Sequence, residues 1–116
     1  MNGPLKNFDI FDLSKKLVVA CYSLTDNLPP EEKTNLIQCI RNAALSVHLE
    51  ILQCTFLRKE KGKKNHIRNA KNSLVVIDAA IDVLIEVGLI KEKDRSEVMQ
   101  LSSTCYQLLD RLKKEK

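Results

Sequence analysis

Basic side chains gather between positions 58 and 68 of this 116-residue chain, and phosphate is the ligand that such a cluster would bind. Lysine and arginine attract the phosphate groups of nucleic acids through charge, with little dependence on sequence. The predicted phosphate contacts are Arg58, Lys59, Lys61, Lys63, Lys64 and Arg68, with Arg41 as a lesser candidate. The competing interpretation is a lysine-rich surface that only keeps the protein soluble.

No residues are spaced for catalysis or metal binding. His48 and His66 lack the HExxH or paired Glu-x-x-His context of a metal site, and no serine stands in a nucleophile-elbow pattern. The 3 glycines are too scattered to cradle a phosphate. The 4 cysteines include no CxxC pair and fall within helical patterns, which favours buried, reduced thiols. We therefore predict a protein that is not an enzyme and holds no cofactor or metal.

A ridge of acids forms a second charged feature. Asp78, Asp82 and Glu86 are four residues apart, so they would stack on one helix face, where like charges repel. Either solvent screens them or a basic surface offsets them. Arg41 is the one basic residue expected at that height of the fold, and it would pair within the chain or across a subunit contact.

Composition restricts the classes of protein that remain. The formal charge of +4 is a mild excess, and 44% hydrophobic residues suffice for one buried core. With 4% aromatics and no Trp, a base-stacking platform is not expected. No apolar run approaches a membrane span, and residues 1–10 lack the apolar segment of a signal peptide. We expect a cytoplasmic protein with no membrane contact.

The segment 29–58 is the helix around which the rest should pack. It begins with Pro-Pro-Glu-Glu, which suits a helix start, and runs without Gly or Pro to Gly62. Its apolar stripe is wide enough for two neighbours. The stripe comprises Leu36, Ile37, Ile40, Ala43, Ala44, Val47, Ile51, Leu52 and Cys54.

Three further helices are predicted around it. The first should be capped by Asp12 and end at Asn27, after a loose arm over residues 1–11. The third should start near Asn65 and end at Gly88, and the fourth should precede a frayed tail at 113–116. Their apolar residues recur at alternating spacings of three and four, the pattern of bundle packing. The predicted fold is all-α, an up-down-up-down antiparallel four-helix bundle in a single domain, 1–116.

This topology sorts the charges by position. The start of the first helix, the link between the second and third, and the end of the fourth would share one end. Fourteen basic and five acidic residues fall there, a formal charge of +9. The opposite end would carry −3 and the middle −2.

The sequence at 28–47 resembles that of a known family. It reads LPPEE at 28–32 and LIQCIRNAALSV at 36–47. This resembles the small bacterial four-helix-bundle proteins encoded in intervening sequences of 23S ribosomal RNA genes, where Gln-x-x-Arg-x-Ala-x-x-Ser-Ile follows a proline-plus-acid turn. Residues 72–74 with Asp78, and VGLI at 87–90, look like the third helix of that family and the turn after it. The resemblance spans residues 13–112.

One departure makes the chain look closer to a sister group. The family usually continues with Asn-Ile-x-Glu-Gly, whereas this chain has Glu50, Ile51, Gln53 and Cys54. The sister group comprises the accessory variability proteins of diversity-generating retroelements, which are pentameric bundles that bind nucleic acid and a reverse transcriptase. The resemblance implies a homopentamer, a basic surface for RNA, and a reverse transcriptase as a partner.

These observations predict a non-enzymatic, oligomeric bundle associated with RNA or DNA, in its most specific form a reverse-transcriptase accessory protein. The alternative is a structural protein–protein adaptor with no nucleic-acid role. The homo-oligomer is also predicted from apolar residues expected on the outer faces. Those residues are Val18, Val19, Leu45, Leu49, Val76 and Val83.

Overall fold

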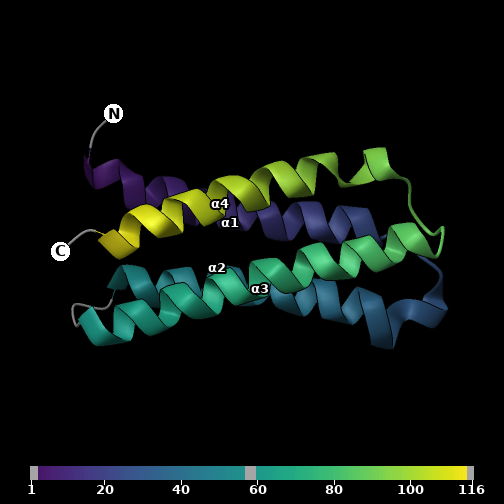
Figure 1. The fold of residues 1–116 in the computed structure, drawn as a ribbon, viewed down its shortest axis with the longest axis horizontal. Coiled ribbons are helices and arrows are strands. Elements are labelled where there is room, and N and C mark those ends of the chain that lie inside the picture. The colour runs from purple at the N-terminus through teal and green to yellow at the C-terminus, as the bar shows by residue number, and fades with distance from the viewer. Residues whose placement is uncertain (1–2, 57–59, 115–116) are drawn as a thin grey trace.

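Four long helices lie side by side in the computed structural model, which describes the backbone of residues 3–56 and 60–114 (Figure 1). They are α1 (Gly3–Thr25), α2 (Gln38–Phe56), α3 (Glu60–Glu86) and α4 (Ser96–Lys114). Side chains are described for residues 10–32, 35–54 and 62–112. α1 and α3 each pack against both α2 and α4, and the α2–α3 contact is the most extensive. The prediction of an all-α, antiparallel four-helix bundle is confirmed.

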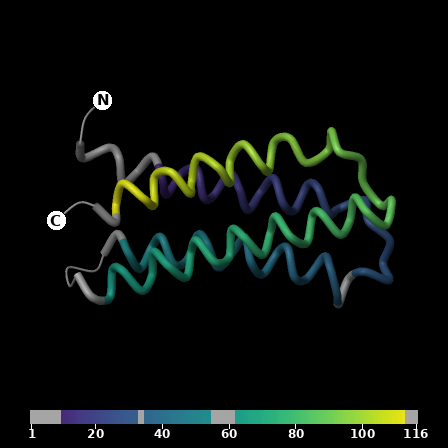
Figure 2. The backbone as a smooth tube through the Cα atoms, viewed as in Figure 1, coloured from purple at the N-terminus to yellow at the C-terminus, as the bar shows by residue number. Residues whose placement is uncertain are grey.

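Both ends of the bundle can be followed along the backbone in Figure 2. The connections from α1 to α2 and from α3 to α4 lie at one end. The start of α1, the end of α4, and the facing ends of α2 and α3 lie at the other (Figure 1). This is the arrangement on which the predicted separation of charge depends, so we call the second end the basic end.

On α2 and α3, the buried core residues closely match the predicted apolar stripes. On α3, the whole seam is buried: Ile67, Ala70, Leu74, Ile77, Ile81 and Leu84. Along α2 and the turn just before it, all of the predicted stripe except the half-buried Leu36 and Leu52 is buried. On α4 the buried face is rotated slightly from the one that the apolar spacing predicts. Leu109 is fully buried, whereas Leu101 and Leu108 are half-buried. None of the described helices combines the length and apolarity that a membrane span requires.

The first helix starts well before the predicted position. α1 begins at Gly3, so the prediction of a loose arm over 1–11 is wrong for residues 3–11, and residues 1–2 lie outside the described part. Pro4 is compatible with a first helical turn, where its missing N–H needs no partner. The buried stripe also extends back to Ile10 through Ser14, seven and three residues before Leu17. Asp12 therefore lies inside the helix rather than at its cap.

The entry into the second helix is less regular than predicted. A 3₁₀ turn, η1 (Pro30–Glu32), and a π turn, η2 (Lys33–Ile37), precede the regular helix, which starts at Gln38. Residues 31–35 are all polar and include Thr and Asn, which are weak helix formers. No apolar side chain anchors a regular turn against the core before the half-buried Leu36 and the buried Ile37.

The third helix also starts earlier than predicted, at Glu60 instead of near Asn65. Gly62 was expected to separate the second helix from the third, but it lies in the first turn of α3. The Glu and Lys residues around it are good helix formers, and a glycine costs only about 0.5–1 kcal/mol relative to alanine even within a helix. The fourth helix continues through Lys113 and Lys114, which were predicted to fray, and residues 115–116 lie outside the described part.

Gly88 ends α3 as predicted. Its φ of +83° lies in the left-handed region. Its N–H donates to the carbonyl of Ile85, and the N–H of Leu89 donates to the carbonyl of Leu84, the two bonds of a Schellman motif. The chain then passes through a 3₁₀ turn, η3 (Glu92–Arg95), into α4.

Candidate nucleic-acid interface

The predicted basic loop is in large part the beginning of a helix. Lys63, Lys64 and Arg68 lie in the first turns of α3, at the basic end. Lys64 and Arg68 are four residues apart, so they lie on the same side of the helix. With Ile67 and Lys71 they line a hollow of about 250 Å³ on the surface. The structure thus brings together three of the predicted phosphate contacts.

The other predicted contacts at this end are only partly described. Arg58 and Lys59 lie outside the described residues. Lys61 lies within α3, and its side chain is outside the described part.

Pairing with acids divides the basic residues into two groups. Four of them form ion pairs with acids of the same chain: Lys16 with Asp12, Arg41 with Asp26, Lys71 with Asp110, and Arg95 with three acids. Lys63, Lys64 and Arg68 have no acidic partner among the described side chains. Arg68 donates a hydrogen bond to the amide oxygen of Asn65 at 3.0 Å, which leaves its charge uncompensated. The start of α3 therefore carries a cluster of cations without an acidic partner among the described side chains.

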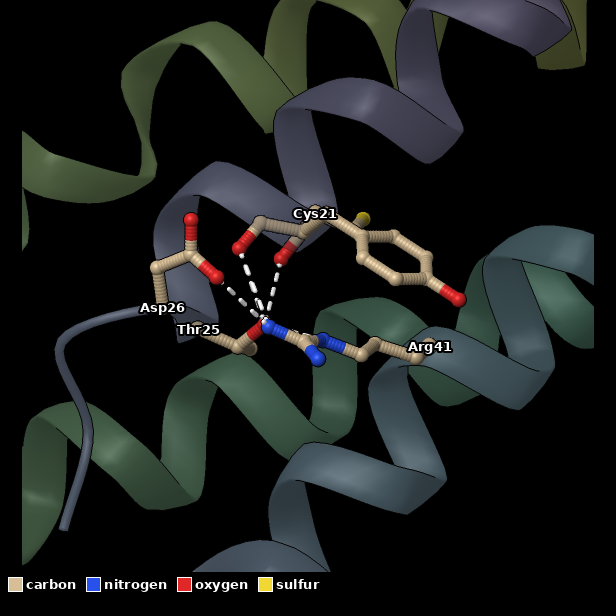
Figure 3. A network of polar contacts seen from close by, with 5 residues as sticks. Cys21, Thr25, Asp26 and Arg41 are labelled. Atoms are coloured by element: carbon tan, nitrogen blue, oxygen red, sulfur yellow. Dashed lines mark hydrogen bonds and ion pairs between the residues drawn. The ribbon is translucent and has the colours of Figure 1, made fainter. Parts of the chain in front are cut away.

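Arg41 is held within the fold, as Figure 3 shows. From α2 it reaches the end of α1, where its Nε donates to the Thr25 hydroxyl at 2.8 Å. Its Nη2 donates to Asp26 at 3.0 Å and to the Tyr22 carbonyl at 3.3 Å. The guanidinium also lies 4.3 Å from the centroid of the Tyr22 ring. Arg41 therefore pairs within the chain, but with Asp26 and not with the acidic ridge, and this pairing ties α1 to α2.

The acidic ridge has a basic partner within the chain that the sequence analysis missed. Arg95, in η3, reaches α3 and forms ion pairs of 2.9 Å with both Asp78 and Asp82. The expectation that Arg41 is the one basic residue at that height is therefore wrong. The turn before α4 folds Arg95 back against α3, and seventeen residues separate it from Asp78 in the sequence. Arg95 therefore offsets part of the charge of the ridge from within the chain.

Each of the two histidines contacts a side chain of another helix. His48 Nδ1 lies 2.7 Å from the Ser14 hydroxyl, and its ring lies 4.5 Å from that of Phe11. Burial lowers the pKa of His48, and the charge of Lys15 lowers it further. His66 contacts the Glu50 carboxylate at 2.5 Å, which joins α3 to α2. The described residues contain no group of three or more His, Cys, Asp or Glu side chains that could hold a metal ion.

Three of the four cysteines are buried, and Cys39 is exposed, contrary to the expectation that all would be buried. Burial raises the pKa of the Cys21 thiol to about 12 and that of Cys105 to about 11. Burial also raises the pKa of Cys54, and the charge of Lys63 partly opposes this shift. These three thiols stay protonated and unreactive at neutral pH.

Tyr106 is an aromatic residue close to the candidate interface that the sequence analysis did not single out. It lies on α4 with its side chain partly exposed, and the Lys71 ammonium lies 4.9 Å from its ring centroid. The low aromatic content of the chain argued against the stacking of nucleic-acid bases. A single aromatic ring in a suitable position can stack a base even in a chain with few aromatic residues. The sequence does hold one signal for an exposed ring. Tyr106 directly follows Cys105, which lies on the apolar seam of the helix, so the tyrosine must point away from that seam.

Comparison with known proteins supports the fold and the family. The crystal structure of a protein of unknown function of the S23 ribosomal protein family, from Bacteroides thetaiotaomicron, is similar to this chain with a TM-score of 0.85. The two are 18% identical, and the match covers 95% of this chain and 99% of that one. At this identity the likeness establishes a shared fold. None of the curated proteins matches the chain.

The sequence itself places the chain in a family. The family model described as 23S rRNA-intervening sequence protein matches residues 6–112, nearly the whole chain. That span includes every helix of the bundle and the described basic residues of α3. On this match, the chain belongs to the 23S rRNA-intervening sequence protein family.

Proposed function

We propose that this protein associates with nucleic acid through the basic end of its bundle and catalyses no reaction. The observation that carries the proposal is the stripe formed by Lys64 and Arg68, with Lys63 beside it, since none of the three has an acidic partner among the described side chains. Elsewhere in the described chain, Arg41, Lys71 and Arg95 are each paired with a nearby acid. A phosphate backbone is the common polyanion that would compensate such a stripe.

The helix geometry strengthens this argument. Lys63 and Lys64 stand near the N-terminus of α3, which carries the positive end of the helix dipole. Cations there are unfavourable for stability, and a bound anion would interact favourably with both the cations and the positive end of the dipole. After the acidic Glu60, the first turns of α3 carry basic residues where helix stability alone would favour acidic ones.

The name of the family refers to 23S rRNA, which makes RNA a natural first ligand to test. Contacts at this site would be made mainly to phosphate, so binding should be weakly sequence-specific and strongly salt-dependent. Each phosphate contact contributes a slope of about −0.9 in log K against log salt on duplex DNA, or about −0.7 on single strands.

The proposed assembly is a homo-oligomer of five subunits. Large apolar side chains are exposed on several helices, among them Val19, Leu45, Leu49, Val76 and Val83, while Val18 is half-buried. Burying the apolar residues of α2 and α3 between subunits would remove them from water. A ring would also repeat the basic stripe around its axis, so affinity should rise steeply with nucleic-acid length. Light scattering tests the assembly, and a monomer at micromolar concentration would refute it.

The function is tested by titrating structured RNA and single-stranded DNA with matched variants. Lys64→Gln with Arg68→Gln removes two charges from the stripe, and should lower affinity and flatten the salt slope by about 1.4 on single strands. Lys91→Gln with Lys93→Gln removes two charges from exposed lysines at the opposite end and should leave both unchanged. Equal behaviour of the two double variants, or no binding by the wild type at low salt, would contradict the proposal.

A second candidate function is the structural adaptor, and the exposed apolar residues favour it. In that case a protein partner would cover Leu45, Leu49 or Val76, and the basic end would only aid solubility. The most specific form of the nucleic-acid proposal, an accessory role to a reverse transcriptase, adds a protein partner as well. Co-purification with a reverse transcriptase that depends on added RNA supports the accessory role, and RNA-independent binding to another protein supports the adaptor.

A further inference from the structure

The hollow at the basic end continues along the seam between α3 and α4. A second hollow of about 380 Å³ lies there, lined by Leu74, Val75, Asp78, Met99, Ser102, Ser103, Tyr106 and Gln107. Its α3 residues follow one turn after those of the first hollow, which end at Lys71. Lys71 joins the two, because it lines the first hollow and its ammonium lies over the ring of Tyr106, which lines the second. We call the two hollows together the α3–α4 groove.

The second hollow offers an aromatic face with polar groups beside it. Tyr106 is 40% exposed, so its ring has surface left for contact with a ligand. The buried Leu74 contributes to the lining, and Val75 and Met99 add further apolar surface. Ser103 and Gln107 supply hydrogen-bond donors and acceptors in the same lining. This combination fits a flat, apolar ring with polar edges.

The charges of the groove differ along its length. At the end that holds Tyr106, Asp78 is paired at 2.9 Å with Arg95, which also pairs with Asp82 and Glu92. Lys71 is paired with Asp110 across the seam. Lys64 and Arg68 have no acidic partner among the described side chains, so the open end of the groove is cationic. Lys64 and Lys71 are separated by about 10 Å along the helix axis, at 1.5 Å per residue.

We infer that the α3–α4 groove binds a single strand of nucleic acid, with phosphates on Lys64 and Arg68 and one base stacked on Tyr106. The inference rests on the proposed function and names its substrate class. The phosphates of a duplex could also bind the basic side chains, but its bases are stacked inside the double helix. An unpaired base can turn outward and stack on an aromatic ring. The polar side chains of Ser103 and Gln107 then lie where the edge of that base can be bonded.

The test compares Tyr106 with its counterpart on α1. Tyr22 is 42% exposed and also has a cation over its ring, but it lies against Arg41, away from the α3–α4 groove. Tyr106→Ala should weaken binding of a single-stranded oligonucleotide by about 5-fold or more, the lower bound for loss of one base–aromatic stack. Tyr106→Phe and Tyr22→Ala should bind as the wild type does. Duplex binding should be insensitive to Tyr106→Ala.

A fluorescent reporter gives an independent readout. The chain has no tryptophan, so Tyr106→Trp introduces a single indole whose emission a stacked base should quench. An oligonucleotide with abasic sites retains the phosphates and should not quench it. Quenching by the base-containing strand alone supports the inference.

Three results overturn it, and they are distinguishable from failure of the proposed function. If Tyr106→Ala binds the single strand like the wild type while Lys64→Gln with Arg68→Gln does not, phosphate binding stands and the stacked base is wrong. If Tyr106→Ala changes the oligomer mass in light scattering, Tyr106 is a subunit contact and the groove is occupied by protein. If the wild type binds no nucleic acid at low salt, the inference and the proposed function fail together.

Discussion

Replacing Lys64 with Glu should stabilise the fold and at the same time weaken nucleic-acid binding. Lys64 lies four residues before Arg68 on α3, and like charges at this spacing destabilise a helix by about 0.2–0.5 kcal/mol. Glu at the same place would attract Arg68 by a similar amount. Lys64 is the fifth residue of α3, at the edge of the dipole's range, so the reversed charge adds about 0.3 kcal/mol at most.

These contributions sum to about 1 kcal/mol at low ionic strength, which for a chain of this size raises the melting temperature by about 4 °C. The gain should shrink in high salt, because the residues are exposed and the Debye length falls from about 30 Å to about 3 Å between 0.01 M and 1 M. Thermal melts followed by circular dichroism at low and high salt measure both effects. Oligonucleotide titrations on the same samples measure the loss of binding.

Lys93→Glu is the matched control, since it makes the same charge change in η3 among other acids at the opposite end. It should bring no gain in stability and no loss of binding. A lower melting temperature for Lys64→Glu, or a gain that is equal in high salt, would refute the electrostatic reasoning. Unchanged affinity would refute the assignment of Lys64 to the interface.

Four further predictions concern the fold. Ile77 is fully buried, so Ile77→Ala should lower the free energy of unfolding by about 2–5 kcal/mol in denaturant titrations. Gly88→Ala places a Cβ in open space at a φ of +83°, so the backbone cost alone should reduce stability by about 1–2 kcal/mol. A thiol reagent should react rapidly with Cys39 and with the three buried cysteines only after unfolding, and stability should fall between pH 9 and 12 as the unfolded Cys21 thiol ionises first. The lowered pKa of His48 means that the unfolded state binds its proton first, so stability should fall as pH drops below about 6.5, and His48→Gln should reduce that dependence.

Apolar periodicity was sufficient to predict the bundle because burial of side chains decides which face of each helix turns inward. It failed where polar residues take part in that face. Ser14 and Thr25 are buried on α1, and each donates a hydrogen bond to a carbonyl of its own helix. A search for apolar residues alone passes over both. Because Ser14 lies between the buried Ile10 and Leu17, missing it placed the start of α1 too late.

The sequence predicted the positive charge of the candidate site, but not which of the basic side chains are paired with acids. The composition of residues 58–68 identifies a basic region, and three of its members do come together at the start of α3. Which cations are already neutralised depends on contacts between distant segments, such as that of Arg95 with Asp78. The position of Tyr106 beside Lys71 likewise depends on how α4 is rotated against α3, and neither contact has a signature in local sequence.

The start of α1 and the end of α4 lie at the same end of the bundle, which has a practical consequence for studying this protein. α1 starts and α4 finishes at the end of the bundle that carries Lys64 and Arg68 (Figure 1). An affinity tag or fluorescent fusion at either terminus would therefore sit next to the candidate interface and compete with nucleic acid for it. The turn between α3 and α4, at residues 87–91, lies at the far end and is partly exposed to solvent. Labels or inserted epitopes belong there, and binding data from terminally tagged protein should be checked after the tag is removed.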